Sequence, residues 1–157
     1  MNVEAKIESG CSDIFESNAE AIVNAVNCVG VMGKGLALQF KNRFPENFAT
    51  YKDACNRNKL QLGAVLVYDH GEAVQPRFII NFPSKNHWRD PSKIDYIESG
   101  LVSLAQAIKT HNISSIAVPA LGCGLGGLKW EEVRPRIVEA LSPIEHLTVY
   151  LLSLIHI

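Results

Sequence analysis

The chain has 157 residues, of which 47% are hydrophobic and 20% are charged, and its formal net charge is −1. This length favours one domain, and this composition is ordinary for a globular protein that buries a core. A nearly neutral chain is not a basic nucleic-acid binder as a whole, although a local basic patch is compatible with it.

Strand-like and helix-like segments alternate along the chain. Strands are predicted at residues 3–7, 21–27, 64–68, 77–82, 115–120 and 146–151, and helices at 33–44, 46–58, 94–111 and 130–141. Pro135 is expected to interrupt the last helix near its first turn. The alternation is typical of an α/β layered fold with a parallel or mixed sheet, in which ligands bind beyond the carboxyl ends of the strands.

Two glycine-containing loops follow predicted strands and precede predicted helices. The first is Gly33-Lys34-Gly35, and the second runs from Gly122 to Gly127. Glycines let the main chain approach a ligand and turn its N–H groups onto an anion. Neither loop matches a Walker A motif or the G-x-G-x-x-G fingerprint, which disfavours a kinase and a common NAD dehydrogenase. One such loop is equally well explained as a tight turn, but two together favour a ligand with a diphosphate.

Three polar residues near the predicted strand ends are candidate ligand contacts. Asn24 and Asn27 lie at the end of the strand at 21–27, where a side-chain amide needs hydrogen-bond partners. We expect Asn24 to satisfy main-chain groups of the following loop, whereas Asn27 serves either that purpose or a ribose hydroxyl. Asp13, after the first strand, is either a turn or cap residue or an acceptor for an adenine amino group.

The cysteines and the apolar runs indicate the compartment. Cys11, Cys28, Cys55 and Cys123 form no C-x-x-C pair and have no histidine at zinc-finger spacing. We interpret them as reduced, mostly buried thiols and expect no metal site. The N-terminus lacks the apolar core of a signal peptide, and no apolar run reaches the ~20 residues that span a bilayer. We therefore expect a cytoplasmic protein with no membrane partner.

Residues 152–157 end the chain with the sequence Leu-Ser-Leu-Ile-His-Ile. This segment matches a translated transposon-adapter sequence used in library preparation, so we interpret it as a non-native tail and assign it no function. We expect residues 1–151 to form the functional domain, and the sequence leaves open whether the natural protein continues past Leu151.

The pattern of these segments resembles the macrodomain family, which binds ADP-ribose. The resemblance rests on Asp13-Ile14, the run from Ala21 to Asn27 and the two glycine loops, and it covers about residues 3–151. It implies a three-layer α/β/α fold with a mixed, mostly parallel central sheet. It also implies ADP-ribose as ligand or product, with no cofactor.

The resemblance assigns roles to individual residues. Asp13 would take the adenine, Ile14 would pack near it, Val26 would also contact the ligand, and Asn27 would meet the distal ribose. Two loops would wrap the diphosphate and that ribose, and their contact residues would be Gly33, Lys34, Gly35, Leu36, Gly122, Cys123, Gly124, Leu125 and Gly126.

Residues 29–41 and 81–91 are similar to a narrower branch, the DarG-type antitoxin macrodomains. Members of this branch remove ADP-ribose that a DarT-type toxin places on thymidine bases in DNA. The likeness implies an ADP-ribosyl glycohydrolase whose substrate is ADP-ribosylated single-stranded DNA and whose partner is such a toxin. The related human terminal ADP-ribose glycohydrolase has a lysine at the Lys85 position but an aspartate where this chain has Gly126, so its lysine–aspartate pair is absent here.

The same likeness makes Lys85 catalytic, with Asn27 holding the sugar. A protonated Lys85 would stabilise or protonate the departing base, and a neutral one would attack the ribose carbon; we favour the charged role. His87, Trp88 and Arg89 follow in the same polar loop. An indole and a guanidinium suit contacts with the bases and phosphates of DNA, although an indole packed at the domain edge is an equal alternative.

Other functions are compatible with these residues. The domain could be a non-catalytic reader of ADP-ribose, or a hydrolase acting on ADP-ribosylated protein or on O-acetyl-ADP-ribose. It could also serve as an interaction protein that holds the toxin. Release of ADP-ribose from DNA, protein and small-molecule substrates would distinguish these alternatives.

Overall fold

The computed structural model describes residues 4–9 and 13–152. Its central sheet has the strand order β1-β6-β5-β2-β4-β3. The strands are β1 (Lys6–Ser9), β2 (Ala21–Val26), β3 (Leu66–Asp69), β4 (Phe78–Pro83), β5 (Ser115–Val118) and β6 (Thr148–Leu151). Every neighbouring pair is parallel except β3 with β4. The mixed, mostly parallel sheet is therefore confirmed.

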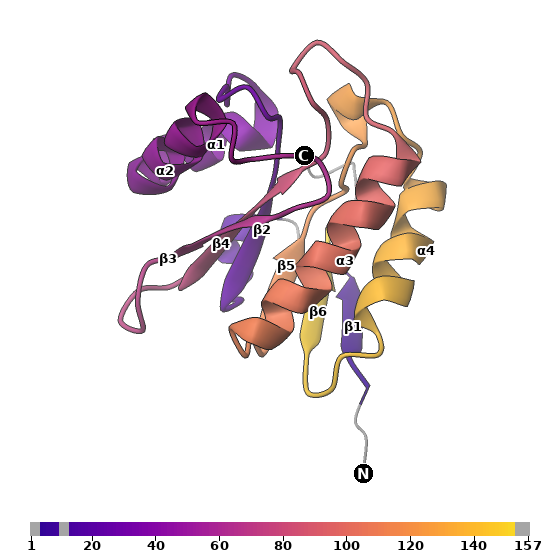
Figure 1. The fold of residues 1–157 in the computed structure, drawn as a ribbon. Helices are drawn as coiled ribbons and strands as arrows, with labels where there is room; N and C mark the ends of the chain where they lie inside the picture. The colour runs from indigo at the N-terminus through magenta and orange to yellow at the C-terminus, as the bar shows by residue number, and fades with distance from the viewer. Residues whose placement is uncertain (1–3, 10–12, 153–157) are drawn as a thin grey trace.

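Helices cover both faces of this sheet (Figure 1). α1 (Gly35–Arg43) and α2 (Pro45–Asn56) lie on one face, and α3 (Ile94–Thr110) and α4 (Trp130–Leu141) lie on the other. Two short 3-10 helices, η1 (Ile14–Glu16) and η2 (Gly124–Gly126), follow β1 and β5. The predicted three-layer α/β/α architecture is confirmed.

The central strand β2 contributes to both layers of the core. Ala21 and Val23 pack with residues of α3 and α4, whereas Ile22 and Val26 pack with residues of α1 and α2. Successive side chains of a strand point to opposite faces, so a strand covered on both sides is apolar at nearly every position. This is why the run at 21–27 predicts a buried strand so clearly.

α3 packs unusually close to β4. Its buried residues Ile97, Leu101, Leu104 and Ile108 recur at helical spacing. Gly100 is also buried, and a Cβ atom at this position would lie 2.3 Å from Cζ of Phe82. The glycine therefore makes room for the phenyl ring of β4 against the helix.

Pro135 does not interrupt the last helix, contrary to the prediction. α4 runs from Trp130 to Leu141 with Pro135 inside it. A proline removes one main-chain hydrogen bond and crowds the preceding turn. Val133, Ile137 and Leu141 are nevertheless buried along one side of this helix, and tertiary packing of this kind supplies most of the stability of protein helices.

The ends of the sheet differ slightly from the prediction. β1 lies at Lys6–Ser9 rather than at residues 3–7, and residue 3 lies outside the described residues. β6 begins at Thr148 rather than at residue 146, because His146 has a left-handed backbone with φ of 62°.

The proposed tail and one cysteine lie largely outside the described residues. Of the tail, only Leu152 is described; its N–H donates to the carbonyl of Val118 at 3.1 Å, and its side chain is buried. Cys11 is also outside, whereas Cys28, Cys55 and Cys123 are free thiols.

Within residues 4–9 and 13–152, no helix combines the length and the apolar character needed to cross a membrane.

A candidate ligand site at the carboxyl ends of the strands

The predicted site residues converge at one end of the sheet. β4, β2 and β5 are parallel neighbours, so the loops that follow them leave from the same edge. In Figure 1 these loops lie at the top of the molecule.

Asn27 is held by a dense set of hydrogen bonds. Its Oδ1 accepts from the N–H groups of Val29 (3.0 Å) and Val31 (3.4 Å) and from the hydroxyl of Tyr51 (2.7 Å). Its Nδ2 donates to the carbonyl of Val31 at 2.8 Å. An amide nitrogen carries two hydrogens, and only one of them bonds to Val31. The second Nδ2 hydrogen has no acceptor among the described residues, so it can donate to a ligand. The loop-binding role is observed, and the ribose contact stays a prediction.

Two main-chain hydrogen bonds join the segments that carry the candidate catalytic residues. The N–H of Ser84 donates to the carbonyl of Val26, and the N–H of Cys28 donates to the carbonyl of Asn86, each at 2.9 Å. The candidate asparagine lies between Val26 and Cys28, and the candidate lysine lies between Ser84 and Asn86. Asn27 and Lys85 therefore lie on two neighbouring backbone segments that are hydrogen-bonded to each other.

The loop after β4 presents a cation and an aromatic ring together. Lys85 Nζ donates to the main-chain carbonyl of Trp88 at 3.2 Å. The indole of Trp88 is 47% exposed, the guanidinium of Arg89 lies 4.6 Å from its centroid, and the ring of His87 lies 5.1 Å away. An indole this exposed is not packed into the domain edge, and Arg89 and His87 lie against its ring.

The first glycine loop exposes its main chain. Gly33, Lys34 and Gly35 are exposed, and Leu36 is half-buried at the start of α1. Lys34 is the N-cap residue of this helix, and its side chain makes no capping hydrogen bond. The first N–H groups of a helix lack intrahelical partners and attract anions. This loop can thus present N–H groups to a phosphate.

The second glycine loop is packed tightly against the residues that precede α3. Gly122 has φ of +73°, and a Cβ atom there would lie 2.7 Å from Cδ1 of Leu128. Gly126 is buried, and its carbonyl accepts from the N–H of Ser92 at 2.9 Å. A Cβ atom at Gly126 would lie 2.6 Å from Oγ of Ser92. Leu125, by contrast, is 73% exposed. Close packing leaves no room for a side chain at positions 122 and 126, so the loop needs glycine there to keep this shape.

Asp13 and Ile14 begin the short helix η1. The Asp13 carboxylate accepts a hydrogen bond from the N–H of Phe15 at 2.9 Å. Ile14 is only 2% exposed and packs in the core under α1 and α2. The cap role of Asp13 is observed, and the adenine contact of both residues stays a prediction.

Asn24 does not satisfy main-chain groups of the loop, contrary to expectation. Its Nδ2 donates to Sδ of Met32 at 3.7 Å, and its buried Oδ1 has no hydrogen-bond partner in the described part of the chain. Side chains alternate along β2, so Asn24 faces the same layer as Ile22 and Val26, where the buried Met32 lies against it.

Sequence reasoning missed Tyr51, which lies on α2. Its side chain is fully buried, and its hydroxyl also lies 2.9 Å from the main-chain oxygen of Asn27. Burial raises the pKa of Tyr51 above its usual range, so the hydroxyl stays neutral and acts as a donor. The available signal was a tyrosine at a buried helical position, because a buried phenol usually needs a hydrogen-bond partner.

The thiols near the candidate site are neutral. Burial raises the pKa of both Cys28 and Cys123 to about 11. At pH 7, Cys123 therefore places no negative charge in the second glycine loop, which is predicted to contact a diphosphate. No group of three or more His, Cys, Asp or Glu side chains within the described ranges could hold a metal ion.

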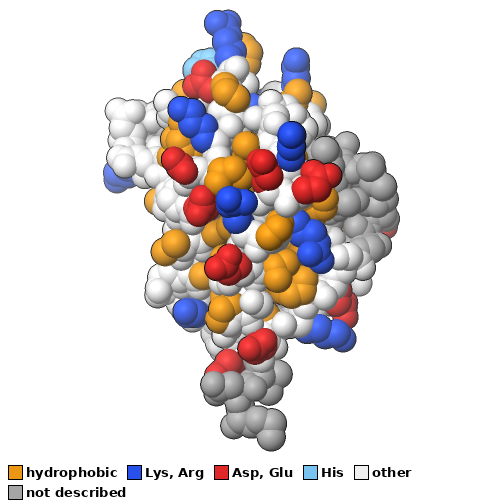
Figure 2. Space-filling view, turned by 90° about the vertical axis from the view of Figure 1, so that its right-hand side faces the viewer, with side chains coloured by type: hydrophobic (Ala, Val, Ile, Leu, Met, Phe, Trp, Pro, Cys, Tyr) orange, Lys and Arg blue, Asp and Glu red, His pale blue; other side chains and the backbone are white. Residues whose placement is uncertain are grey.

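The loops at this end of the sheet are more basic than the chain as a whole. Between them, residues 27–35, 84–93 and 119–129 hold one carboxylate, Asp90, and five cationic side chains, which belong to Lys34, Lys85, Arg89, Lys93 and Lys129. In Figure 2, basic side chains protrude at the upper end beside a histidine and an acidic side chain, and acidic and basic side chains intermingle over the rest of this face. The net charge of −1 therefore conceals a basic set of loops, next to which Asp95, Glu131 and Glu132 begin the helices α3 and α4.

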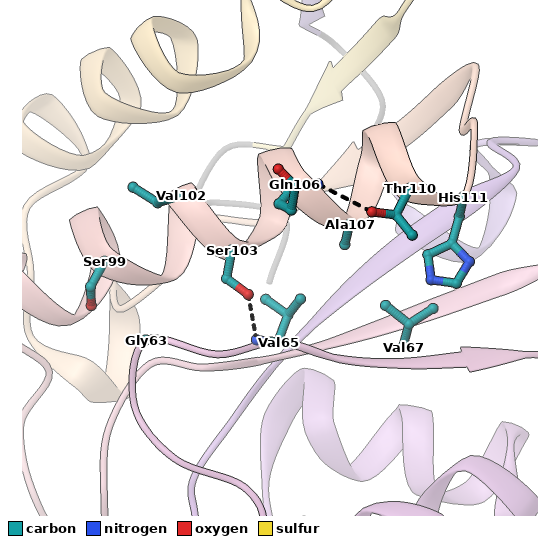
Figure 3. A pocket seen from close by; sticks show the side chains of 10 residues that line it. All are labelled: Gly63, Val65, Val67, Ser99, Val102, Ser103, Gln106, Ala107, Thr110 and His111. Carbon is teal, nitrogen blue, oxygen red and sulfur yellow. Dashed lines mark hydrogen bonds between the residues drawn. The ribbon is translucent and has the colours of Figure 1, made fainter.

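A shallow groove of about 450 Å³ lies elsewhere, between β3 and α3 (Figure 3). Ser103 Oγ accepts a hydrogen bond from the N–H of Val65 at 3.0 Å, and Gln106 Nε2 donates to Thr110 Oγ1 at 3.3 Å. None of the residues lining the groove is a predicted site residue.

Comparisons with known proteins place these observations in context. The family model described as Macro domain matches residues 23–137. A DNA ADP-ribosyl glycohydrolase of Mycobacterium tuberculosis is 51% identical over 138 residues, which are 88% of this chain and 39% of that protein. A DNA ADP-ribosyl transferase–glycohydrolase fusion protein of Thermosipho africanus is 38% identical over 164 residues, covering 92% of this chain and 42% of that protein. The chain thus spans about two-fifths of the length of these curated relatives.

Solved structures show the same similarity. The macrodomain of Thermus aquaticus DarG matches with a TM-score of 0.91 and 48% identity, covering 94% of this chain and 98% of that one. Thermosipho africanus DarTG, solved in complex with ADP-ribose, matches with a TM-score of 0.86 and 37% identity, covering 95% of this chain and 42% of that one.

Proposed function

This chain belongs to the Macro domain family, and from that premise we propose that it is an ADP-ribosyl glycohydrolase that releases ADP-ribose from thymidine bases in single-stranded DNA. The observation that carries the proposal is the placement of Lys85 and Asn27 on hydrogen-bonded neighbouring segments, at the edge of the sheet that also bears both glycine loops. The relatives named DNA ADP-ribosyl glycohydrolase support the reaction class.

In this proposal, ADP-ribose extends from the start of η1 across the two glycine loops to Asn27. The adenine binds near Asp13 and Ile14, and the diphosphate accepts hydrogen bonds from the N–H groups of the two glycine loops. The second Nδ2 hydrogen of Asn27 donates to a hydroxyl of the distal ribose. The solved relative that contains ADP-ribose supports the class of ligand.

Lys85 acts on the bond between the distal ribose and the base. When this bond breaks, its electron pair leaves with the base and positive charge develops on the sugar. A protonated Lys85 stabilises the departing base and donates a proton to it, while the oxygen of a water molecule forms the new bond to the ribose carbon. The proton that this water loses passes to the neutral amine of Lys85 and restores its charged form. The Nζ bond to the carbonyl of Trp88 holds the amine in its loop before substrate arrives.

The exposed ring of Trp88 supports DNA as the substrate. A neighbouring base can stack on this indole, and Arg89, stacked on the same ring, can contact a phosphate. His87 lies beside them and completes the proposed DNA contact. The basic residues of the loops add a sequence-independent attraction for the DNA backbone.

We also propose a DarT-type toxin as a partner of the whole protein. The support is the relative from Thermosipho africanus, in which a transferase and a glycohydrolase form one protein. A glycohydrolase that erases the mark of such a transferase would act as its antitoxin.

Replacement of Lys85 by alanine tests the proposed reaction. We expect Lys85→Ala to lower the single-turnover rate of ADP-ribose release from a thymidine-modified oligonucleotide by about 100-fold or more, because the departing base loses its acid. Calorimetry should show that free ADP-ribose still binds. Lys109→Ala, at the far end of α3, serves as the control and should keep the wild-type rate.

Three results would contradict the proposal. Equal rates for wild type and Lys85→Ala would remove the catalytic role of the lysine. Binding of ADP-ribose without release from any substrate would identify a reader. Faster release from ADP-ribosylated protein or O-acetyl-ADP-ribose than from DNA would assign a different substrate.

A further inference from the structure

Tyr51 is bonded to the asparagine on which the proposed ribose contact depends. Its hydroxyl lies 2.7 Å from Oδ1 and 2.9 Å from the main-chain oxygen of Asn27. A phenol has one hydrogen to donate, and the shorter distance favours Oδ1 as its acceptor. The bond therefore acts on the side chain of Asn27 as well as on the position of its backbone.

The other partners of the Asn27 side chain belong to the loop that Asn27 itself begins. Those partners are main-chain groups of Val29 and Val31, whose side chains are 41% and 40% exposed. Tyr51, by contrast, lies in the middle of α2 and is fully buried. Its hydroxyl thus ties the amide of Asn27 to a rigid element rather than to an exposed loop.

α2 is in turn fixed to the strand that precedes Lys85. Asn47 of α2 and Asn81 of β4 exchange two side-chain hydrogen bonds, at 3.1 and 2.8 Å, and both residues are fully buried. A buried amide pair with its bonds satisfied specifies one arrangement of the packed elements. One helix therefore holds both the strand that leads to Lys85 and the residue Asn27.

The orientation of an amide decides what it offers to a ligand. With Oδ1 directed at Tyr51 and the loop N–H groups, Asn27 presents its second Nδ2 hydrogen as a donor. If the amide rotated, it would present an acceptor, which a ribose hydroxyl satisfies only by turning its own hydrogen away from other partners.

We propose that Tyr51 is a positioning residue for ADP-ribose release: its hydroxyl holds the Asn27 amide so that Nδ2 faces the distal ribose. The inference rests on the proposed function, because the reaction it serves is the one proposed above. It assigns to α2, which carries none of the predicted ligand contacts, a part in ordering the site.

The test compares Tyr51→Phe with wild type. Phenylalanine keeps the buried ring and removes only the hydroxyl, so we expect a folded protein with about tenfold weaker ADP-ribose binding by calorimetry and a slower single-turnover release, as the loss of one oriented hydrogen bond implies. Tyr150→Phe, which removes the hydroxyl of a partly buried tyrosine on β6, should leave both unchanged.

A double-mutant cycle separates positioning from a general loss of structure. If Tyr51 acts through Asn27, adding Tyr51→Phe to Asn27→Ala should produce no further change in binding or release. Effects that multiply instead would show that Tyr51 acts through the fold and would overturn the inference. Equal binding and release by Tyr51→Phe and wild type would also overturn it, while leaving the proposed function intact.

A measurement on the unaltered protein covers the case in which Tyr51→Phe does not fold. In ¹H–¹⁵N spectra, ADP-ribose should strongly change the chemical shift of one Nδ2 proton of Asn27. The other Nδ2 proton, which is hydrogen-bonded to the carbonyl of Val31, should keep nearly the same shift. Unshifted Nδ2 protons at saturating ADP-ribose would refute the assigned orientation. A wild-type protein that binds ADP-ribose but releases none would instead refute the proposed reaction, and this spectrum would still report on Asn27.

Discussion

At the scale of single residues, the candidate site depends on contacts that are only a few atoms wide. Ser92 lies against Gly126 so closely that an added Cβ atom would meet its Oγ at 2.6 Å and its Cβ at 3.1 Å. The Ser92 hydroxyl is buried and has no hydrogen-bond partner in the described residues. The serine thus occupies the space that any side chain at position 126 would need, an aspartate included.

This contact predicts the effect of a small substitution. Gly126→Ala should lower the free energy of unfolding by about 1–3 kcal/mol, because the loop cannot accommodate the methyl group without moving Ser92. Chemical denaturation measures the change, and Leu125→Ala, at the exposed neighbouring position, provides the control. Adding Ser92→Gly should restore part of the loss; if Gly126→Ala is as stable as wild type, the packing described here is incorrect.

Some residues of the candidate site could be predicted from the sequence, and others could not. Asn27 stands out because a side-chain amide at the end of a buried strand needs hydrogen-bond partners, and the glycine loops stand out because two of them follow predicted strands. Tyr51 lies 24 positions from Asn27, and only the packing of α2 on the sheet brings the two together. The sulfur partner of Asn24 is hidden for the same reason, since Met32 returns over β2 through the loop.

At the scale of elements, the strands and helices were predictable because each has a regular apolar pattern. All strands and α-helices of the described residues lie where periodicity predicts them, to within a few positions at their ends. Two of the differences each involve a single residue. Pro135 is tolerated inside α4 by the buried face of that helix, and His146 delays β6 by its backbone conformation.

The contact between α3 and β4 provides a test at this scale. In an exposed helix, Gly→Ala stabilises by up to about 1 kcal/mol through helix propensity. In α3 we expect Gly100→Ala to destabilise by about 1–3 kcal/mol, because the new methyl group would overlap the ring of Phe82.

Thermal and chemical unfolding measure whether Gly100→Ala raises or lowers the free energy of unfolding. Ser99→Ala, one position away on the exposed side of the same helix, should change stability by less than about 0.5 kcal/mol. A stabilising Gly100→Ala would mean that α3 and β4 are farther apart than the structure places them.

At the scale of the whole molecule, the distribution of charge matters more than its sum. Five cationic residues lie in the three loops that follow β2, β4 and β5, although the chain carries a net charge of −1. Composition could therefore exclude a generally basic protein but could not reveal where the positive charge gathers. The fold makes this surface by bringing the ends of three separate strands to one edge.

Such a surface predicts a salt-dependent affinity for DNA. Each phosphate neutralised on a single strand contributes about −0.7 to the slope of log K against log salt concentration. We expect binding of a thymidine-modified oligonucleotide to Lys85→Ala, in which release of ADP-ribose is slowed, to weaken steadily with salt in fluorescence anisotropy. Adding Arg89→Gln should make the slope shallower by about 0.7, because one phosphate contact is lost. Lys109→Gln should leave it unchanged, since it lies at the other end of α3. An equal slope with and without Arg89 would show that the arginine stacked on Trp88 does not contact the DNA backbone.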